Sequence, residues 1–568
     1  MVLAAEDAGP LRLDAGFIDY LIVVLYFAFV LGIGYVARRQ VSDSLDFFLS
    51  GRSLPAWVTG LAFISANLGA IEIMGMSANG AEFGVVTMHY FWVGAVPAML
   101  FLGIVMMPFY YGSKVRSVPE FMLRRFGPEA HLVNAISFAV AQVLIAGINL
   151  FLLGSIIEAL LGWSIWISMG LAAAVVLSYT ALGGLSAAIY NEVLQFFVIV
   201  AALLPLTLVA LHKVGGWDGF TAAVADSPGG AEQLSSWPGQ GLTGFDSPVW
   251  SVIGIVLGLG FVLSFGYWTT NFVEVQRAMA SNSMSAARRT PIIGAFPKMF
   301  IPFIVVIPGM LAAVLVSDLA AFKETGEGNV DYNDALLLLM RDLLPNGMLG
   351  IAIAGLMASF MAGMAANISA FNTVFSYDIW QTYIVKDRAD DYYLQLGRLA
   401  TVGATVLAIG TAGLAMGYEN LMDYLQTLFG FFNAPLFATF ILGMFWKRMT
   451  SAAGWIGLVS GTLAAVVVAV LSEDALGPVS VGIVPLSGQG ASFAAAGAAF
   501  VVDIIVSVAV SRVTAPKPVE QLAGLVWSQT PRESLRDPDE ASASWYQSPT
   551  KLAGIGLVLV IALNLLFP

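Results

Sequence analysis

Residues 54–82 read LPAWVTGLAFISANLGAIEIMGMSANGAE, and the rest of the chain is organised around this stretch. It is long and apolar enough to cross a bilayer, yet Ser65, Asn67, Gly69 and Glu72 interrupt its middle. A carboxylate near the bilayer centre costs roughly 2.5–3.5 kcal/mol on insertion scales, so it normally faces a partner, a cavity or an ion path. We therefore expect a helix that is broken at this point and forms half of a transport site.

The composition of the whole chain is that of a polytopic membrane protein. Of its 568 residues, 58% are hydrophobic and 11% are charged, with a mean hydropathy of +0.83, whereas soluble domains carry about 25% charged residues. The sequence has no cysteine, which excludes disulfides and thiolate metal sites. His89, His131 and His212 are too far apart to suggest a metal cluster. No nucleotide-binding or catalytic motif occurs, so we expect neither enzyme activity nor a cofactor, and no nucleic-acid partner.

Fourteen apolar runs are each long enough to cross the hydrocarbon core, which takes about 20 helical residues. They lie near 16–37, 54–79, 84–109, 130–158, 163–182, 192–212, 247–270, 293–316, 345–382, 397–416, 420–446, 452–471, 495–512 and 551–567. Acidic residues precede the first run where a signal peptide would be basic, so we interpret it as a retained span.

The orientation follows from the positions of Lys and Arg, which are enriched in cytoplasmic loops. With the N-terminus outside, only Arg12, Lys213, Lys323 and Arg341 fall in outer segments, and Lys298 falls within a span. The other twenty of the 25 basic residues then lie inside. We therefore predict a protein of the plasma membrane with both termini outside and with acidic outer loops at 213–246 and 317–344.

Four segments resemble the sodium:solute symporter family. Residues 178–195, SYTALGGLSAAIYNEVLQ, are similar to the family signature, and residues 267–277, YWTTNFVEVQR, resemble its sodium/glucose and sodium/galactose branch most closely. Residues 117–127, SVPEFMLRRFG, and 440–448, FILGMFWKR, match loops of the family. All four occur in the family's order, and the resemblance covers about residues 18–470.

The resemblance implies an all-α membrane protein with a LeuT-type core of two inverted five-helix repeats. The expected units are a peripheral span and loop at 1–53, a first repeat at 54–212, the outer loop 213–246, a second repeat at 247–451 and peripheral spans at 452–568. Such carriers place solute and ions where the first helix of each repeat is broken. The glycine-rich residues 254–266 weaken the corresponding helix of the second repeat.

The same resemblance implies which residues bind the solute. They are Asn67, Glu72, Tyr90, Phe91, Ser264, Tyr267, Lys298 and Gln426. This chain departs from the sugar carriers, because Glu72 replaces a sugar-binding Gln and Phe91 replaces an acidic sugar ligand. Gly94 and Ser264 likewise replace a Ser and an Asn. We expect Glu72 and Lys298 to pair across the pocket, or one of them to bind a polar group of the solute; the alternative is that each is a hydrated or snorkelling side chain near a span end.

A sodium site is implied at backbone carbonyls of Ser65, Leu68 and Ser359 and at two hydroxyl positions, which here hold Ala362 and Gly363. Both hydroxyls are therefore missing, and hard cations prefer several oxygen ligands. A shifted register would bring in Asn367 or Ser369 instead. Glu192 occupies the place of a family Asp linked to cation coupling. A proton on Glu72 or Glu192 is an alternative to sodium, since burial raises the pKa of a carboxyl group.

The sequence thus predicts a secondary active transporter that couples a cation, sodium by resemblance, to symport of a small polar solute such as a sugar or organic acid. The alternatives are a proton-coupled or uncoupled carrier, or a membrane sensor that signals through residues 513–550. Otherwise we expect residues 513–550, which are rich in Pro, Ser and mixed charge, to form a solvated tether. The bilayer and the solute are the expected partners, with no obligate protein partner indicated.

Overall fold

The computed structural model describes residues 12–37, 39, 43–112, 115, 117–416, 421–473, 475–476, 479–486, 488–540 and 544–567. Within these residues the fold is helical, and the β-type pairing found is one isolated bridge between Leu54 and Ser281. Of the basic residues behind the predicted orientation, Arg38, Lys114 and Arg116 lie outside the described residues.

Fourteen helical elements are described up to residue 214. They are α1 (Phe17–Ala37), α2 (Ser44–Leu49), η2 (Ser50–Arg52), α3 (Ala56–Asn67), η3 (Ile71–Gly75), α4 (Met76–Phe83), η4 (Gly84–Met88), η5 (Tyr90–Ala95), α5 (Val96–Phe101), η6 (Leu102–Met106), α6 (Met107–Gly112), α7 (Val118–Arg125), α8 (Pro128–Leu161) and α9 (Ile165–Val214).

The middle of the chain continues with short helices and a second set of long ones. They are α10 (Gly216–Ala225), η7 (Ala231–Leu234), α11 (Gln240–Thr243), α12 (Pro248–Ile253), η8 (Gly254–Ser264), α13 (Phe265–Thr270), α14 (Phe272–Met279), α15 (Met284–Phe300), α16 (Pro302–Leu315), α17 (Ser317–Thr325), η9 (Tyr332–Asp334), α18 (Ala335–Leu343), α19 (Met348–Thr373) and η10 (Val374–Ile384).

The remaining helices complete the bundle. They are α20 (Asp390–Ala415), α21 (Leu421–Phe445), α22 (Ser451–Leu471), α23 (Gly488–Val513), η12 (Val519–Leu522), η13 (Trp527–Gln529), α24 (Arg532–Leu535) and α25 (Pro549–Leu566).

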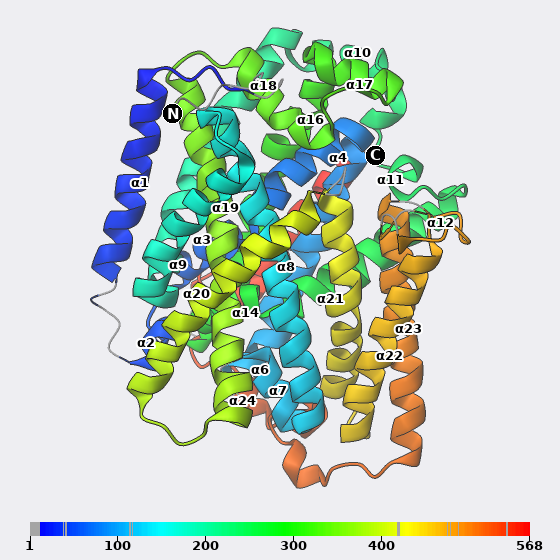
Figure 1. Cartoon of the computed structure of the whole chain (residues 1–568). Coiled ribbons are helices and arrows are strands. Elements are labelled where there is room, and N and C mark those ends of the chain that lie inside the picture. Colours follow the sequence, from blue (N-terminus) through cyan, green and yellow to red (C-terminus); the bar gives the residue numbers. More distant parts are fainter. Residues whose placement is uncertain are drawn as a thin grey trace.

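The described helices account for the predicted membrane spans. Twelve are long and apolar enough to cross a membrane, and a bent pair, Ala56–Asn67 with Ile71–Met88, makes a thirteenth. The shorter apolar helix Ile165–Ala181 lies where the remaining span was predicted. In Figure 1 the start of α1 lies at the same end of the molecule as α10, α17 and α18, while α7 and α24 lie at the opposite end. Phe567, directly after α25, accepts a hydrogen bond from Ser236 in the segment that follows α10.

The first predicted break is present, between α3 and η3. The two halves differ in direction by 64°, and Leu68 leaves helical geometry with φ −72° and ψ 47°. The Oδ1 atom of Asn149 on α8 accepts the Ala70 N–H at 2.9 Å, which satisfies a backbone group at the break, as an apolar surrounding requires. A Cβ on Gly69 would lie 2.9 Å from that same Asn149 oxygen, so a larger residue does not fit here.

The second break lies later than the sequence indicated. The glycine-rich stretch Gly254–Ser264 forms a continuous π-helical segment, η8. The chain leaves helical geometry at Asn271 instead, with φ −72° and ψ 118°, and the Asn271 side chain caps α14 by accepting the Val273 N–H at 3.0 Å. Glycines that weaken a helix therefore did not mark its break, because neighbouring helices hold η8 together: a Cβ on Gly258 would already lie 3.0 Å from Phe493.

The described part of the 513–550 loop is largely exposed, as its composition indicated, but several of its side chains contact the helical bundle. Leu522 and Val526 are buried. The Trp527 ring packs on Phe109 and Phe445, with ring centroids 5.2 and 5.9 Å away. The loop therefore lies against the helical bundle through apolar contacts.

Candidate functional site

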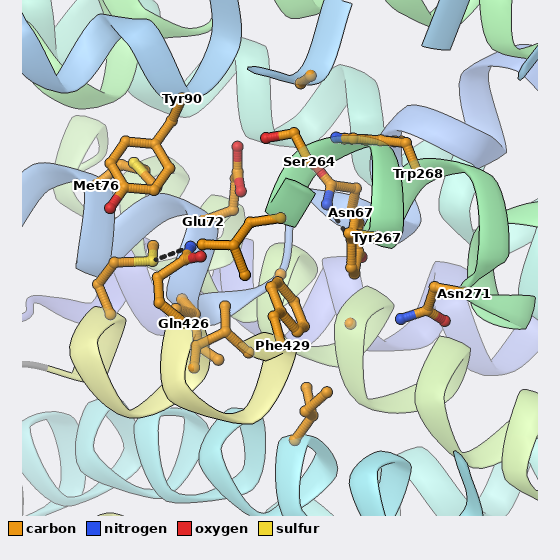
Figure 2. A pocket seen from close by; sticks show the side chains of 18 of the residues that line it. Asn67, Glu72, Met76, Tyr90, Ser264, Tyr267, Trp268, Asn271, Gln426 and Phe429 are labelled. Atoms are coloured by element: carbon orange, nitrogen blue, oxygen red, sulfur yellow. Dashed lines mark hydrogen bonds between the residues drawn. The ribbon is translucent and has the colours of Figure 1, made fainter. Parts of the chain in front are cut away.

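A cavity lies at the two helix breaks, between η3, η8, α13, α15 and α21. Seven of the eight solute-site residues predicted from the sequence line it: Asn67, Glu72, Tyr90, Ser264, Tyr267, Lys298 and Gln426. In Figure 2 the labelled side chains of this set surround a common space. Tyr90 lies in the upper part of the view, and Gln426 and Phe429 on α21 lie in the lower part. The cavity brings together residues more than 300 positions apart in the chain.

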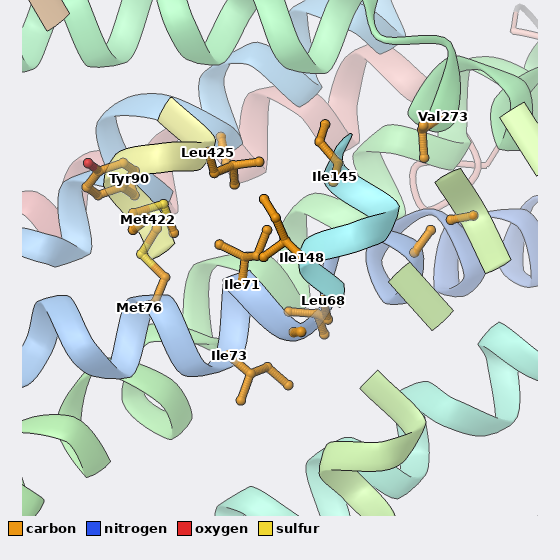
Figure 3. Packing of buried hydrophobic residues seen from close by; sticks show 14 of the residues in the cluster. Leu68, Ile71, Ile73, Met76, Tyr90, Ile145, Ile148, Val273, Met422 and Leu425 are labelled. Carbon is orange, nitrogen blue, oxygen red and sulfur yellow. The ribbon is translucent and has the colours of Figure 1, made fainter. Parts of the chain in front are cut away.

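An apolar shell surrounds the polar centre. Figure 3 shows buried apolar side chains of this shell: Leu68 and Ile71 at the first break, Ile148 on α8, and Met422 and Leu425 on α21. Ile71, Met422 and Leu425 line the cavity directly. These side chains belong to one large buried cluster. The low polarity of this shell strengthens every hydrogen bond and ion pair inside it.

Lys298 and Glu72 form an ion pair across the break. The Lys298 Nζ donates to the Glu72 carboxylate and to Asn67 Oδ1. The Lys298 side chain is 1% exposed and that of Glu72 is 15% exposed. The ammonium also lies 4.8 Å from the Phe91 ring centroid and 5.3 Å from that of Trp268, a distance at which aromatic faces attract cations. Because the two charges cancel, the pocket is close to neutral at this point.

Tyr267 connects the two breaks. Its hydroxyl accepts a hydrogen bond from Asn67 Nδ2 at 3.2 Å and donates to Glu274 Oε1 at 2.7 Å. Its ring packs on Phe429, with centroids 4.6 Å apart. The position of this ring is thus set from three sides.

Phe91 is the one predicted solute-site residue that does not line the cavity, so its predicted role in binding stays a prediction. Its side chain is fully buried and it is not among the residues that line the cavity, because it lies under the Lys298 ammonium. Gly94 is equally constrained, since a Cβ there would lie 2.3 Å from Ser264 Oγ. A serine at position 94 would therefore collide with the Ser264 side chain unless that side chain moved.

Tyr90 and Gln426 line the cavity but also have partners in the protein. The Tyr90 hydroxyl donates to Gln489 on α23. Gln426 Nε2 lies 3.3 Å from the sulfur of Met422, a weak acceptor. The amide of Gln426 can therefore turn to a better acceptor at little cost.

The residues implied for sodium come together where the first break meets α19. The Leu68 carbonyl accepts a hydrogen bond from Ser359 Oγ. The Ser65 hydroxyl is buried and has no hydrogen-bond partner among the described residues. Ala362 is buried, and a Cβ on Gly363 would lie 2.9 Å from Gly69 Cα. Asn367 lines the cavity as well. Its alternative role as a sodium ligand stays a prediction.

Glu192 lies behind the cavity instead of lining it. Both of its carboxylate oxygens contact the Arg277 guanidinium, at 2.6 and 3.3 Å, and both side chains are buried. Arg277 also donates to the Val273 carbonyl at 2.9 Å. This pair ties α9 to α14, just beyond the second break.

Sequence reasoning missed Glu274, Asn149 and Asn271. Glu274 is fully buried and stands inside the quoted segment YWTTNFVEVQR, so an acid directly after an apolar span could have drawn attention to it. Asn149 is one amide in a long apolar helix and gave no such signal, although it supports the first break. In the described part of the chain, no group of three or more His, Cys, Asp or Glu residues could hold a metal ion.

The sequence comparisons with known proteins indicate one family. Residues 47–461 match the model of the sodium:solute symporter family. The chain is 29% identical over 459 residues to a sodium/glucose cotransporter of Vibrio parahaemolyticus, an alignment that covers 78% of this chain and 83% of the relative. It is also 29% identical to sodium/glucose cotransporter 4 of Danio rerio, with 94% and 85% covered.

Among solved structures, the fold is similar to that of a Na+-coupled sialic acid symporter. The TM-score is 0.72 at 19% sequence identity, and the match covers 88% of this chain and 99% of the other. At this identity the likeness concerns the fold, which is the predicted inverted-repeat architecture.

Proposed function

This chain belongs to the sodium:solute symporter family, and from that premise we propose that it carries a neutral, sugar-like solute into the cell together with sodium. It is a multi-pass membrane transporter and not an enzyme. The named relatives are sodium/glucose cotransporters, which supports a solute rich in hydroxyl groups.

The ion pair of Lys298 and Glu72 is the observation that carries the choice of a neutral solute. A charged solute would have to compete with one partner of this pair and leave the other charge buried without compensation, which is costly. A hydroxyl group can instead donate to Glu72 and accept from Lys298 while the pair persists. Asn67, Ser264 and Gln426 add further neutral hydrogen-bonding groups at the same cavity.

For sodium, we assign the Ser65 and Leu68 carbonyls together with Ser359. The Ser359 hydroxyl already contacts the Leu68 carbonyl, so it supplies an oxygen that Ala362 and Gly363 lack. The unpartnered Ser65 hydroxyl is a further oxygen at this place. Glu192 acts at a distance, through Arg277, on the helix that follows the second break.

The proposal extends to topology. Both termini are outside the plasma membrane, in accord with the hydrogen bonds that join Asp19 near the start of α1 to Gly347, and Phe567 after α25 to Ser236, in or beside the two predicted outer loops. Residues 54–212 and 247–451 form the two repeats, and each begins with one of the two broken helices. Alternating access then moves one repeat against the other around the cavity.

Uptake by proteoliposomes that contain the purified chain tests this function. An inward sodium gradient should drive uptake of a labelled hexose or polyol, whereas potassium should not, and carboxylates should compete poorly. Asp503→Asn on α23 is a matched control, because Asp503 is buried yet lies outside the cavity. Uptake that ignores sodium would contradict the coupling, and solute binding without counterflow would identify a sensor.

A further inference from the structure

Glu274 is a buried carboxyl group that the proposed transport cycle does not use. It is the third residue of α14 and is fully buried. Its Oε1 atom accepts the hydrogen bond from the Tyr267 hydroxyl at 2.7 Å. Its Oε2 atom is also buried and has no hydrogen-bond partner among the described residues. An ionised carboxylate would thus be held by a single neutral donor.

The charges around Glu274 do not balance if it is ionised. The charged groups that act on it are Arg277 on its own helix, Lys298 on α15 and Glu192 on α9. Each cation already has a carboxylate of its own, because Arg277 binds Glu192 and Lys298 binds Glu72. Two cations therefore face three carboxyl groups, and Glu274 is the one without a cation partner.

The position of Glu274 at the start of α14 favours the ionised form of its carboxyl group. The N-terminus of a helix favours negative charge. That effect is small compared with the penalty for a buried charge that lacks an ionic partner. The balance favours the neutral, protonated carboxyl group.

We propose that Glu274 is a proton-binding site and that its proton keeps the Tyr267 side chain in place against the cavity as a barrier to water, which we call the Tyr267 gate. The proposal rests on the proposed transport function and adds a proton to the same site. With Oε2 protonated, Oε1 accepts from Tyr267, which in turn accepts from Asn67 at the first break. The neutral carboxyl group thereby holds Tyr267 of the second broken helix in its hydrogen bond with Asn67 of the first broken helix.

Loss of this proton opens the gate. The new anion beside Tyr267 attracts water and competes with Glu72 for Lys298, whose ammonium already binds Asn67. The hydrogen bond from Tyr267 to Glu274 becomes stronger, because its acceptor is now charged, whereas the hydrogen bond from Lys298 to Asn67 is lost to this competition, and water enters the cavity beside Asn67. The O–H bond of Glu274 breaks, the proton passes to that water, and it returns when the cavity closes again.

Infrared spectroscopy of the purified full-length chain tests the proton site without any solute. The wild type should show the carbonyl band of a protonated carboxyl group at neutral pH, and Glu274→Gln should lack that component. Gln is the matched replacement, because it is neutral and its amide oxygen still accepts from Tyr267. Identical bands in wild type and variant at every pH would overturn the proposal.

Thiol labelling tests the gate and again requires no solute. The chain has no cysteine of its own, so Leu425→Cys places a single reactive thiol in the cavity lining. The labelling rate of this variant, divided by that of Leu425→Cys/Glu274→Gln, should rise with pH by about tenfold per unit through the titration of Glu274. A ratio that does not change with pH would overturn the gate.

A third variant, Asp503→Asn, shows whether removal of any buried acid changes the pH dependence of labelling. Asp503 accepts hydrogen bonds from Thr439 at 2.7 Å and Ser507 at 2.9 Å, away from the cavity. Asp503→Asn should leave the pH dependence of Leu425→Cys labelling unchanged, and a change equal to that of Glu274→Gln would count against Glu274. A preparation that passes both tests but shows no sodium-driven uptake would refute the proposed function and leave the proton site standing.

Discussion

Lys298 and Glu72 place opposite charges in contact inside the membrane, and the consequences of removing one charge differ from those of removing both. Glu72→Gln leaves the buried ammonium without its carboxylate, and breaking a buried pair in this way costs about 3–5 kcal/mol. We expect a lower melting temperature and solute uptake reduced at least about tenfold, equivalent to about 1.4 kcal/mol.

The double variant Glu72→Gln/Lys298→Met separates stability from transport. It removes the unpaired charge, so its melting temperature should exceed that of Glu72→Gln, because coupled residues do not contribute additively. Uptake should remain low, since the groups that bind hydroxyls are gone. Near wild-type uptake in Glu72→Gln would exclude this pair from the site.

Ser359 offers a second test at the level of single residues. Its hydroxyl lies against the Leu68 carbonyl, and Ser359→Ala removes an oxygen from the proposed sodium site. Half-maximal uptake should then require roughly tenfold more sodium, since a hydrogen bond or ligand to a charged group contributes about 1.5–3 kcal/mol. Ala362→Ser, which restores a hydroxyl at the next turn, should recover part of the loss. An unchanged sodium requirement in Ser359→Ala would remove this serine from the ion site.

Residues that carry charge within apolar spans could be predicted from the sequence, whereas their neighbours could not. Glu72 and Lys298 stood out because an ionised group in a span is expensive, and the structure brings them into contact. Phe91 matched a solute-binding position, but a match in sequence does not specify which way a side chain points. Glu274 escaped notice because it follows the apolar run and is buried only by tertiary packing.

At the scale of helices, the sharp bend of α9 at Gly184 can be tested by adding one methyl group. Gly184 has φ 54°, and a Cβ there would lie 2.5 Å from the Phe47 carbonyl oxygen. With ψ −147°, Gly184 lies in a region that is almost restricted to glycine, so Gly184→Ala should lower the melting temperature of the purified chain through about 1–3 kcal/mol of backbone strain and the added clash.

Gly170 is the matched control on the same helix. A Cβ there meets no atom within 4 Å, so Gly170→Ala should be neutral or slightly stabilising, by about 0.5–1 kcal/mol. Equal melting temperatures for the two variants would show that α2 does not fix the bend.

Apolar length predicted where spans lie, but their internal geometry depends on neighbours. The break at Gly69 was foreseen because polar residues interrupt an apolar run, and Asn149 completes it from another helix. The break at Asn271 was misplaced, since the glycines of η8 are packed against Phe245, Val93 and, on α23, Phe493, and stay helical. A one-dimensional pattern reports the composition of a helix and not the partners that hold it together.

At the scale of the whole molecule, ion pairs join the described part of the 513–550 loop to α15 in the helical bundle. Arg288 on α15 contacts Glu540 at 2.6 Å and Asp537 at 3.3 Å, and the Asp537 side chain is fully buried. Lys298 of the cavity lies on the same helix. Composition alone indicated a solvated segment, because buried ion pairs and aromatic contacts between distant parts of the chain leave no local signal.

Arg288→Gln should release this loop. The change leaves Asp537 buried without its cation, and loss of one partner from a buried pair costs about 3–5 kcal/mol. The loop contains Lys517, Arg532 and Arg536, so trypsin should cleave it at least about tenfold faster in Arg288→Gln, as a shift of 1.4 kcal/mol in opening would produce. Arg341→Gln is the control, because Arg341 pairs with the more exposed Asp318 and Asp342 and exposed pairs contribute about 0–1 kcal/mol. Equal cleavage of the loop in the two variants would show that the apolar contacts of Trp527, and not the ion pairs, hold the loop against the bundle.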